Sequence, residues 1–331
     1  MTLHLLISTL SPTRKPSRCR TGLVGRCALM ISVMFAAPLL AATPMLQPGS
    51  TRPIAEDVYL LPDGGVMLVP NVGIVVGSEG ILVIDTGMGP ANAEIVLSEV
   101  REISDLPITF LVSTHFHPEH NFGAQSFPPE TVLIYSERQH QEIQNKGEHY
   151  QEWFVELFGD DVRALLEPVR LVQPDVTFER KANFNLGGMP VELHHFGRAA
   201  HTMGDTVVFL PEQKVAFAGG LTPNHLFPIL ADADSGIAGW LESLDGLERL
   251  GAEYIVPDHG EPGGPELISR VREYLLAVQK QSSELSRQDV PLEQAQQLMT
   301  ERMVARYPDW GEPHWIAAAV AQVYAEQAKE N

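Results

Sequence analysis

Residues 113–120 read Ser-Thr-His-Phe-His-Pro-Glu-His and follow the apolar, β-branched run ITFLV at 108–112, which predicts a buried strand that runs into His115. His115 and His117 alternate along the extended chain, so both imidazoles point to the same side and could share one metal ion. Pro118 ends the strand and places the next two residues on a turn. The potential ligands are His115, His117, Glu119 and His120. Four ligands within six residues favour a metal site over a chance surface cluster.

The chain on both sides of this segment alternates between strand-rich and helical stretches. Strand patterns cover 53–85, 108–114, 131–136, 176–220 and 254–257, and helical spacing covers 90–103, 137–158, 240–250 and 264–329. This order predicts an α/β fold in which two mixed sheets pack face to face with helices outside, a four-layer αββα sandwich. We expect residues 43–263 to form this domain and residues 264–331 to form a helical extension packed on it.

The first 42 residues differ from the rest of the chain. An uncharged apolar run at 28–42 closes on Ala41-Ala42 and is preceded by five basic residues, Arg14, Lys15, Arg18, Arg20 and Arg26. A basic start, a run too short to span a bilayer and small residues at its end predict a signal peptide at 1–42, cut near Ala42. The mature protein would be periplasmic or secreted and keep no stable membrane anchor. An uncleaved anchor is the alternative.

The predicted signal peptide contains both cysteines, Cys19 and Cys27, so the mature chain would have no disulfide and no thiolate ligand. Its metal ligands would be imidazoles and carboxylates. Removing the peptide leaves 18 basic against 42 acidic residues, a net charge of −24, where the whole chain carries −19. Such a charge argues against nucleic acid or an anionic membrane as partner. We expect the partner to be a small-molecule substrate. The oligomeric state stays open.

The His-rich segment resembles the HxHxDH signature of the metallo-β-lactamase superfamily. Three further landmarks follow the family's order, namely Ile84-Asp85-Thr86-Gly87, residues 200–206 (AHTMGDT) and residues 256–260 (VPDHG). The resemblance covers Val58 to Pro262 and implies the superfamily's sandwich fold and hydrolase activity. It also implies that His115, His117 and His201 bind one zinc ion, while His120 and His259 bind a second. Iron or manganese would also suit such nitrogen and oxygen ligands.

Two departures from the family pattern concern the second metal. Glu119 stands where the signature has Asp, and its carboxylate is one methylene longer. Phe217-Ala218-Gly219-Gly220 stands where many family hydrolases have FAGD, and Gly220 offers no side chain to bridge two metals. The second ion would then depend on Glu119, His120 and His259, a three-residue set like that of catalytic zinc sites. The sequence therefore leaves open whether the protein binds one zinc ion or two.

The resemblance implies hydrolysis at an acyl carbon by metal-bound hydroxide, with Glu119 orienting the water. Asp85 joins the catalytic set because it would hold a ligand histidine by a hydrogen bond, although a cap on the strand-end turn is the alternative. Residues 225–230 (HLFPIL) and 257–260 look like the periplasmic zinc metallohydrolases linked to sulfur oxidation and quinoprotein relays. The substrate would be a thioester, an ester or a lactam. A β-lactamase proper and a catalytically degenerate metal-binding or relay protein are the alternatives.

Other residues carry weaker signals. His225 lies in a Pro-bracketed loop and could contact substrate or compensate for Gly220, or it is simply an exposed loop histidine. The helical tail contains four large aromatic residues, Tyr307, Trp310, Trp315 and Tyr324. Aromatic residues at helical spacing favour packing onto the sheets, and lining the mouth of a substrate site or a dimer contact is the alternative.

Overall fold

The computed structural model describes residues 42–330, so the predicted signal peptide lies outside the described residues apart from Ala42. The strands form two sheets. The first has the order β1-β2-β3-β4-β5-β6-β7, with the bounds Arg52–Ala55, Val58–Leu61, Val72–Val76, Ile81–Ile84, Ile108–Val112, Val132–Ser136 and Val176–Phe178. The second has the order β12-β11-β10-β9-β8, with β8 at Lys181–Asn185, β9 at Pro190–His194, β10 at Val207–Leu210, β11 at Val215–Gly219 and β12 at Tyr254–Pro257.

The helices lie between and after these strands. They are α1 Gly89–Ile103, α2 Pro118–Asn121, the 3-10 turn η1 Ala124–Ser126, α3 Glu137–Phe158, α4 Asp160–Leu166, α5 Ile237–Leu250, α6 Glu266–Arg287, α7 Leu292–Arg306 and α8 Trp315–Glu330. None of those in the described part of the chain is both long and apolar enough to cross a bilayer.

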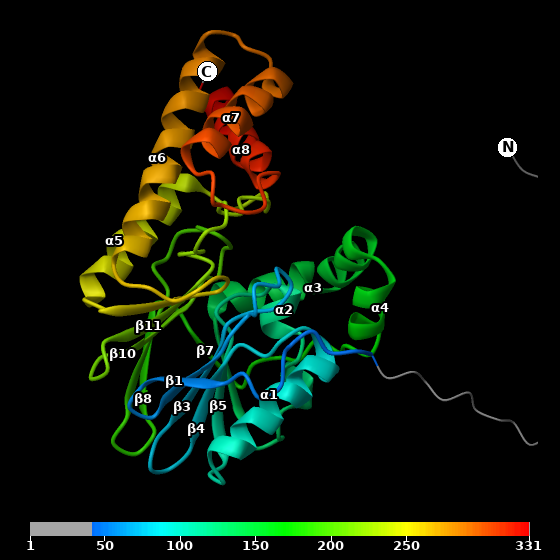
Figure 1. Ribbon diagram of the computed structural model, residues 1–331, viewed down its shortest axis with the longest axis vertical. Coiled ribbons are helices and arrows are strands. Elements are labelled where there is room, and N and C mark those ends of the chain that lie inside the picture. Colours follow the sequence, from blue (N-terminus) through cyan, green and yellow to red (C-terminus); the bar gives the residue numbers. More distant parts are fainter. Residues whose placement is uncertain (1–41, 331) are drawn as a thin grey trace, which may run out of the picture. The chain divides into compact units, whose positions relative to one another are not determined.

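The two sheets pack face to face through one apolar core (Figure 1). Both sheets contribute buried side chains, among them Val75, Ile84, Val112, Leu193, Val208 and Phe217. Gly73 on β3 makes this approach possible, because a Cβ there would lie 2.5 Å from Cε1 of the Phe217 ring. The missing side chain on one sheet therefore seats an aromatic ring from the other.

Helices cover the outer face of each sheet. The helices α1, α3 and α4 share a core with the seven-stranded sheet, whereas α5 to α8 share one with the five-stranded sheet. Helix, sheet, sheet and helix in succession confirm the predicted four-layer αββα fold.

The C-terminal helices have no core of their own. Leu267 and Val320 belong to the same buried cluster as Trp240 on α5. In that cluster the Tyr307 and Trp310 rings stack with their centroids 4.4 Å apart. The boundary predicted at residue 263, between the sandwich domain and the helical extension, stays a prediction. The helices on both sides of it share one core, so packing does not mark a division there.

Candidate metal centre

The predicted ligands follow strands that end at one edge of the sandwich. Strands β4 and β5 are parallel, and Asp85 and residues 113–120 follow their carboxyl ends. Strands β11 and β12 are also parallel, and His259 follows β12. The loop between β9 and β10 carries His201. Strand polarity thus brings together residues that are up to 174 positions apart, from Asp85 to His259.

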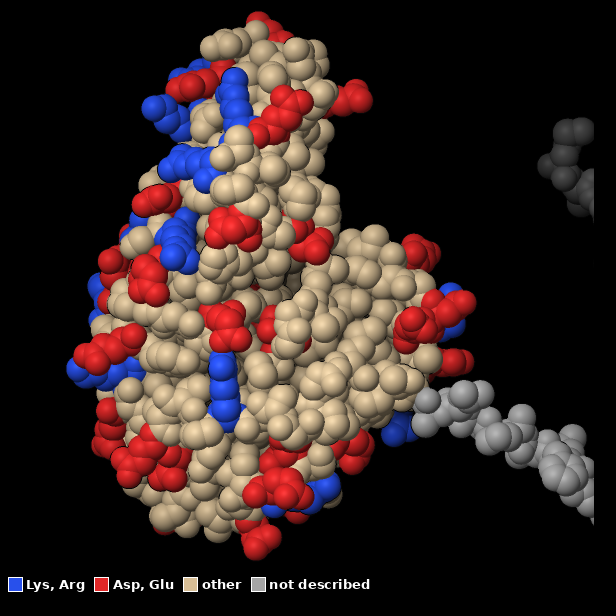
Figure 2. All heavy atoms as spheres, in the orientation of Figure 1, with Lys and Arg blue, Asp and Glu red and all other residues tan. Residues whose placement is uncertain are grey.

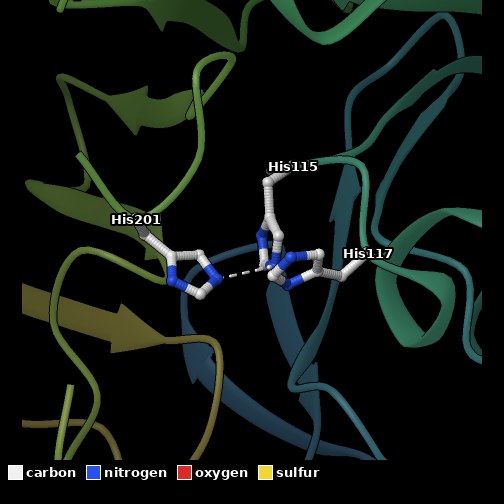
Figure 3. Close-up of side chains that lie close together, drawn as sticks. All are labelled: His115, His117 and His201. Carbon is white, nitrogen blue, oxygen red and sulfur yellow. Dashed lines mark hydrogen bonds between the residues drawn. The ribbon is translucent and has the colours of Figure 1, made fainter. Parts of the chain in front are cut away.

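The first set of donors consists of His115, His117 and His201, whose ring nitrogens come within 4.8 Å of one another. Figure 3 shows the three rings converging, two from the segment after β5 and the third from the opposite side. The Nε2 atoms of His115 and His201 are 3.3 Å apart. His201 donates from Nδ1 to the carbonyl of Ile229 at 3.0 Å, which leaves its Nε2 free for a ligand.

The second set of donors consists of Glu119, His120 and His259, also within 4.8 Å of one another. His259 donates from Nδ1 to the carbonyl of Val69 at 2.9 Å. Glu119 Oε2 and His120 Nε2 are buried and have no hydrogen-bond partner. Unpartnered buried acceptors are costly, so His120 Nε2 fits a metal ion as its missing partner. Glu119 approaches the same place with its other oxygen, Oε1, which lies 3.9 Å from His120 Nε2 and 4.0 Å from His259 Nε2. His115, His120 and Asp258 form an overlapping group.

Asp85 holds the second set from behind. Its carboxylate accepts hydrogen bonds from His120 Nδ1 at 2.8 Å and from the backbone N–H of Thr114 at 2.7 Å. The residue adopts a left-handed backbone, φ 66°, which turns the chain at the end of β4. Because it is buried behind His120, Asp85 is a positioning residue, and its hydrogen bond to a histidine of the donor set is the one expected from the sequence.

The burial of the site favours imidazoles that are neutral. Burial, and then the neighbouring imidazoles, lower the pKa of His115 and His120. The same causes lower the pKa of His201 to about 3. Neutral imidazole is the form that binds a metal, so His115, His120 and His201 are in the correct protonation state at neutral pH. Burial also lowers the pKa of His117, but contact with the Asp232 carboxylate outweighs burial and raises that pKa.

Comparison with known proteins agrees with this geometry. The family model described as the metallo-beta-lactamase superfamily matches residues 66–259, a span that includes every donor named above. The chain belongs to this superfamily. Its homologues are metal-dependent hydrolases, and this chain is a hydrolase of the same superfamily.

Two curated relatives show how far the similarity extends. A linear primary-alkylsulfatase of a Pseudomonas species is 28% identical over 223 residues, which are 58% of this chain and 42% of that protein. The chain thus spans less than half the length of that relative. A metallo-beta-lactamase type 2 of Bacteroides fragilis is 25% identical over 256 residues, which are 74% of this chain and 93% of that protein.

Solved structures share the fold. A metallo-beta-lactamase from Pontibacter korlensis superposes with a TM-score of 0.56 at 24% identity, over 68% of this chain and 98% of that one. Another from Erythrobacter litoralis gives 0.54 at 19% identity, over 70% and 98%. The sulfur-oxidation and quinoprotein-relay branch stays a prediction.

Gly220, the departure from the superfamily's FAGD pattern, has a steric reason. A Cβ at this position would lie 2.2 Å from Cδ2 and 2.7 Å from Cγ of the His201 ring. The imidazole therefore occupies the space that a side chain at position 220 would need. In this superfamily member the His201 ring can take its position only because residue 220 has no side chain, and the bridging carboxylate is missing for the same reason.

Asp232 is a site residue that sequence reasoning missed. It lies in the loop before α5, is buried, and places Oδ2 3.5 Å from His117 Nε2. Its other oxygen accepts a hydrogen bond from the Tyr150 hydroxyl. Burial alone would raise the pKa of Asp232, but contacts with His117, Tyr150 and Lys146 outweigh burial and lower the pKa to about 2. With Nε2 facing this carboxylate, His117 keeps Nδ1 for a ligand.

The predicted substrate residue His225 lies apart from both donor sets. Its ring pairs with Asp309 at 2.8 Å, and 49% of its side chain is exposed. Its backbone φ of 58° and its carbonyl, which accepts from Gly311, fix the loop against the segment before α8. The structure does not bring His225 to the metal centre.

A pocket opens beside the centre and reaches both donor sets. Its empty space is about 520 Å³, part of which is open to solvent. His117, Glu119, His201 and His259 line its inner end. The remaining wall is mainly aromatic and aliphatic, and comes from α3, the segment around Met67 and the start of α8.

Proposed function

We propose that the mature protein is an exported, zinc-dependent hydrolase that cleaves an acyl bond of a small ester, thioester or lactam. One observation carries this proposal. Two donor sets, the second with buried ligand atoms that have no partner, converge at the inner end of a pocket that opens to solvent. His115, His117 and His201 would hold one ion, and Glu119, His120 and His259 a second.

The chain's own residues prepare the site for the attack of water on a carbonyl carbon. Hydrogen bonds from Nδ1 fix the rings of His120, His201 and His259. Glu119 lines the pocket, and its Oε2 is without a partner, so it can accept a hydrogen bond from the attacking water. It takes the water's proton as the new C–O bond forms and passes it to the leaving group as the acyl bond breaks. When bound, the metal supplies a Lewis acid that lowers the pKa of water and stabilises the developing negative charge.

The test combines metal analysis with a substrate panel. We expect purified protein to contain zinc and to hydrolyse a thioester or an aryl ester, and His117→Ala to lose both metal and activity. His225→Ala is the matched control, because this histidine lies outside the donor sets. A protein that holds no divalent metal, or a His117→Ala variant with unchanged hydrolysis, would refute the proposal.

Sulfate ester hydrolysis is the second candidate, because a relative is named linear primary-alkylsulfatase and the pocket wall is apolar. Alkyl sulfates belong in the substrate panel for this reason. Nitrocefin belongs there as well, because it tests the lactam hydrolysis that the Bacteroides relative suggests. Metal without hydrolysis of any of these substrates would favour the degenerate binding or relay protein.

The export part of the proposal has its own test. Expression of the full chain in a Gram-negative host should release the protein with the periplasmic fraction, with an N-terminus near Thr43. A protein that stays with the membrane at full length would point to the uncleaved anchor.

A further inference from the structure

The pocket beside the metal centre is unusually rich in aromatic side chains. Helix α3 contributes Trp153, Phe154 and Phe158, and α8 contributes Trp315 from across the opening. Figure 2 shows a hollow where α3 and the C-terminal helices come near one another, with uncharged surface on its α3 side and acidic but no basic side chains at its border. Such a wall gains free energy by burying apolar surface of a ligand.

Beyond the imidazoles at its inner end, the pocket wall offers no positive side chain to an anionic ligand. Among the described residues that line it none is Lys or Arg, whereas the carboxylates of Glu119 and Asp232 face it. Lys146 lies close by but is already engaged, at 2.8 Å by Asp234 and at 3.1 Å by Glu142. An anionic group along this wall would lose its hydration and find no counter-charge.

One hydrogen-bond donor in the wall is left over. The indole Nε1 of Trp315 is buried and has no partner in the described chain, although its ring lines the pocket. A buried N–H without an acceptor is costly, so a bound molecule with an uncharged acceptor would gain by meeting it. The C-terminal helices thus supply both an apolar surface and a polar anchor to the pocket.

We propose that this pocket binds the bulky apolar part, alkyl or aryl, of an uncharged ester or thioester and selects against substrates with an anion in that position. The inference rests on the proposed function for the reaction, but the binding preference exists without it. Each methylene group buried should raise kcat/KM about fourfold until the pocket is filled.

Two measurements on the full chain test the proposal. The first is kcat/KM of the zinc-loaded protein for p-nitrophenyl acetate, butyrate and hexanoate, which should rise with chain length. The second is binding to the metal-free protein, followed by tryptophan fluorescence because Trp153 and Trp315 line the pocket. Neutral 2-decanone should bind at least tenfold more tightly than decanoate or decyl sulfate.

A positive charge introduced at the rim sharpens the test. Leu157 lines the pocket and is 51% exposed, so Leu157→Arg should fold normally. It should weaken 2-decanone binding about tenfold and strengthen decyl sulfate binding. Leu276→Arg is the matched control, because Leu276 is 47% exposed on α6 and does not line the pocket, and it should change neither affinity.

The outcomes separate this inference from the proposed function. Ester hydrolysis with no chain-length dependence and no 2-decanone binding would overturn the inference and leave the function standing. Selective 2-decanone binding without hydrolysis of any ester, thioester or lactam would overturn the function and leave the inference standing. Tighter binding of decyl sulfate than of 2-decanone to the unaltered protein would overturn the inference outright.

Discussion

Asp232 and Asp85 each place a buried carboxylate beside a different histidine of the metal centre. Asp85 accepts a hydrogen bond from His120 Nδ1, and Asp232 lies 3.5 Å from His117 Nε2. A carboxylate behind a ligand histidine fixes the ring and makes its free nitrogen a better donor. Each donor set therefore has one histidine that is supported by a buried carboxylate.

Asp232→Asn keeps the shape of the side chain and removes its charge. We expect zinc to bind the three-histidine set 10- to 100-fold more weakly, because His117 loses its negative partner. Competition with a chromophoric chelator measures this change. Asp234→Asn is the control, since Asp234 pairs with Lys146 and belongs to neither donor set. Equal zinc affinity in the unaltered protein and Asp232→Asn would show that Asp232 does not act through His117.

Position 220 should not tolerate a side chain. Gly220→Ala would push the His201 ring, which lies 2.2 Å from the new Cβ position, out of the three-histidine set. We expect Gly220→Ala and Gly220→Asp to lose zinc affinity alike, so a carboxylate at this position does not restore a bridging ligand. Zinc stoichiometry after dialysis measures the loss, and tighter zinc binding in Gly220→Asp would contradict the steric explanation.

Helix α3 connects the pocket wall to the loop that carries His201. Ser136 caps its first turn by accepting from the N–H of Gln139. One turn later Glu142, whose side chain is fully buried, accepts from the backbone N–H groups of Met203 and Gly204. The same helix then carries the aromatic wall. A shift of α3 would therefore displace both the pocket wall and the loop that carries His201.

Glu142 should make stability depend on pH. Burial raises its pKa from 4.5 to about 7, although Lys146 and the backbone N–H of Met203 oppose the shift. The native state then keeps a proton that the unfolded chain releases, so this residue's contribution to stability falls as pH rises from about 4.5 to about 7.

Urea unfolding of the metal-free protein at several pH values tests this prediction. The unaltered protein should lose stability relative to Glu142→Gln across that range, with a slope difference of up to about 1.4 kcal/mol per pH unit. Glu148→Gln, at an exposed position on α3, is the control and should follow the unaltered protein. Parallel curves for Glu142→Gln and the unaltered protein would contradict the assignment.

At the scale of the whole molecule the metal centre joins the two sheets. Glu119, His115 and His120 follow the seven-stranded sheet, whereas His201 and His259 belong to loops of the five-stranded sheet. An ion held by either donor set therefore links both halves of the sandwich. Metal binding and stability should be coupled accordingly.

Removal of the metal should lower the thermal stability of the whole domain. Zinc that binds only the native state, at a free concentration 100-fold above its Kd, stabilises by about 2.7 kcal/mol. We expect Tm to fall on chelation and to recover on adding zinc. His225→Ala should show the same recovery, and His201→Ala should not, because only His201 belongs to a donor set. A Tm that is insensitive to chelator would contradict this coupling.

The fold and most of the centre could be predicted from the sequence because their signals are local. His115, His117 and His120 lie within six residues at the end of an apolar strand, and the landmark around His201 is a contiguous motif. Asp232 could not be predicted, since its partner His117 is 115 positions away and an acidic residue in a loop is ordinary. Asp85 was predicted beside a histidine, but its burial became apparent only in three dimensions.

The aromatic residues of the C-terminal helical region could likewise be predicted only in part. Helical spacing predicted packing, and Tyr307 and Trp310 do pack in the core. Trp315 fits both interpretations, because it packs against the same core and also lines the pocket. Spacing along a helix cannot separate these roles, because the path of the loop between α7 and α8 decides which ring faces the site.

The first described residues are bound to α1 by hydrogen bonds and by packing. The backbone N–H groups of Met45 and Leu46 both donate to Asn92 Oδ1, at 2.7 and 2.9 Å, and Leu46 is buried in the core of α1, α3 and α4. A leader cut near Ala42 would leave only Thr43 and Pro44 ahead of this anchor. A peptidase needs extended chain on both sides of the bond that it cuts, so cleavage at that point would have to precede folding, and a purification tag belongs at the other terminus.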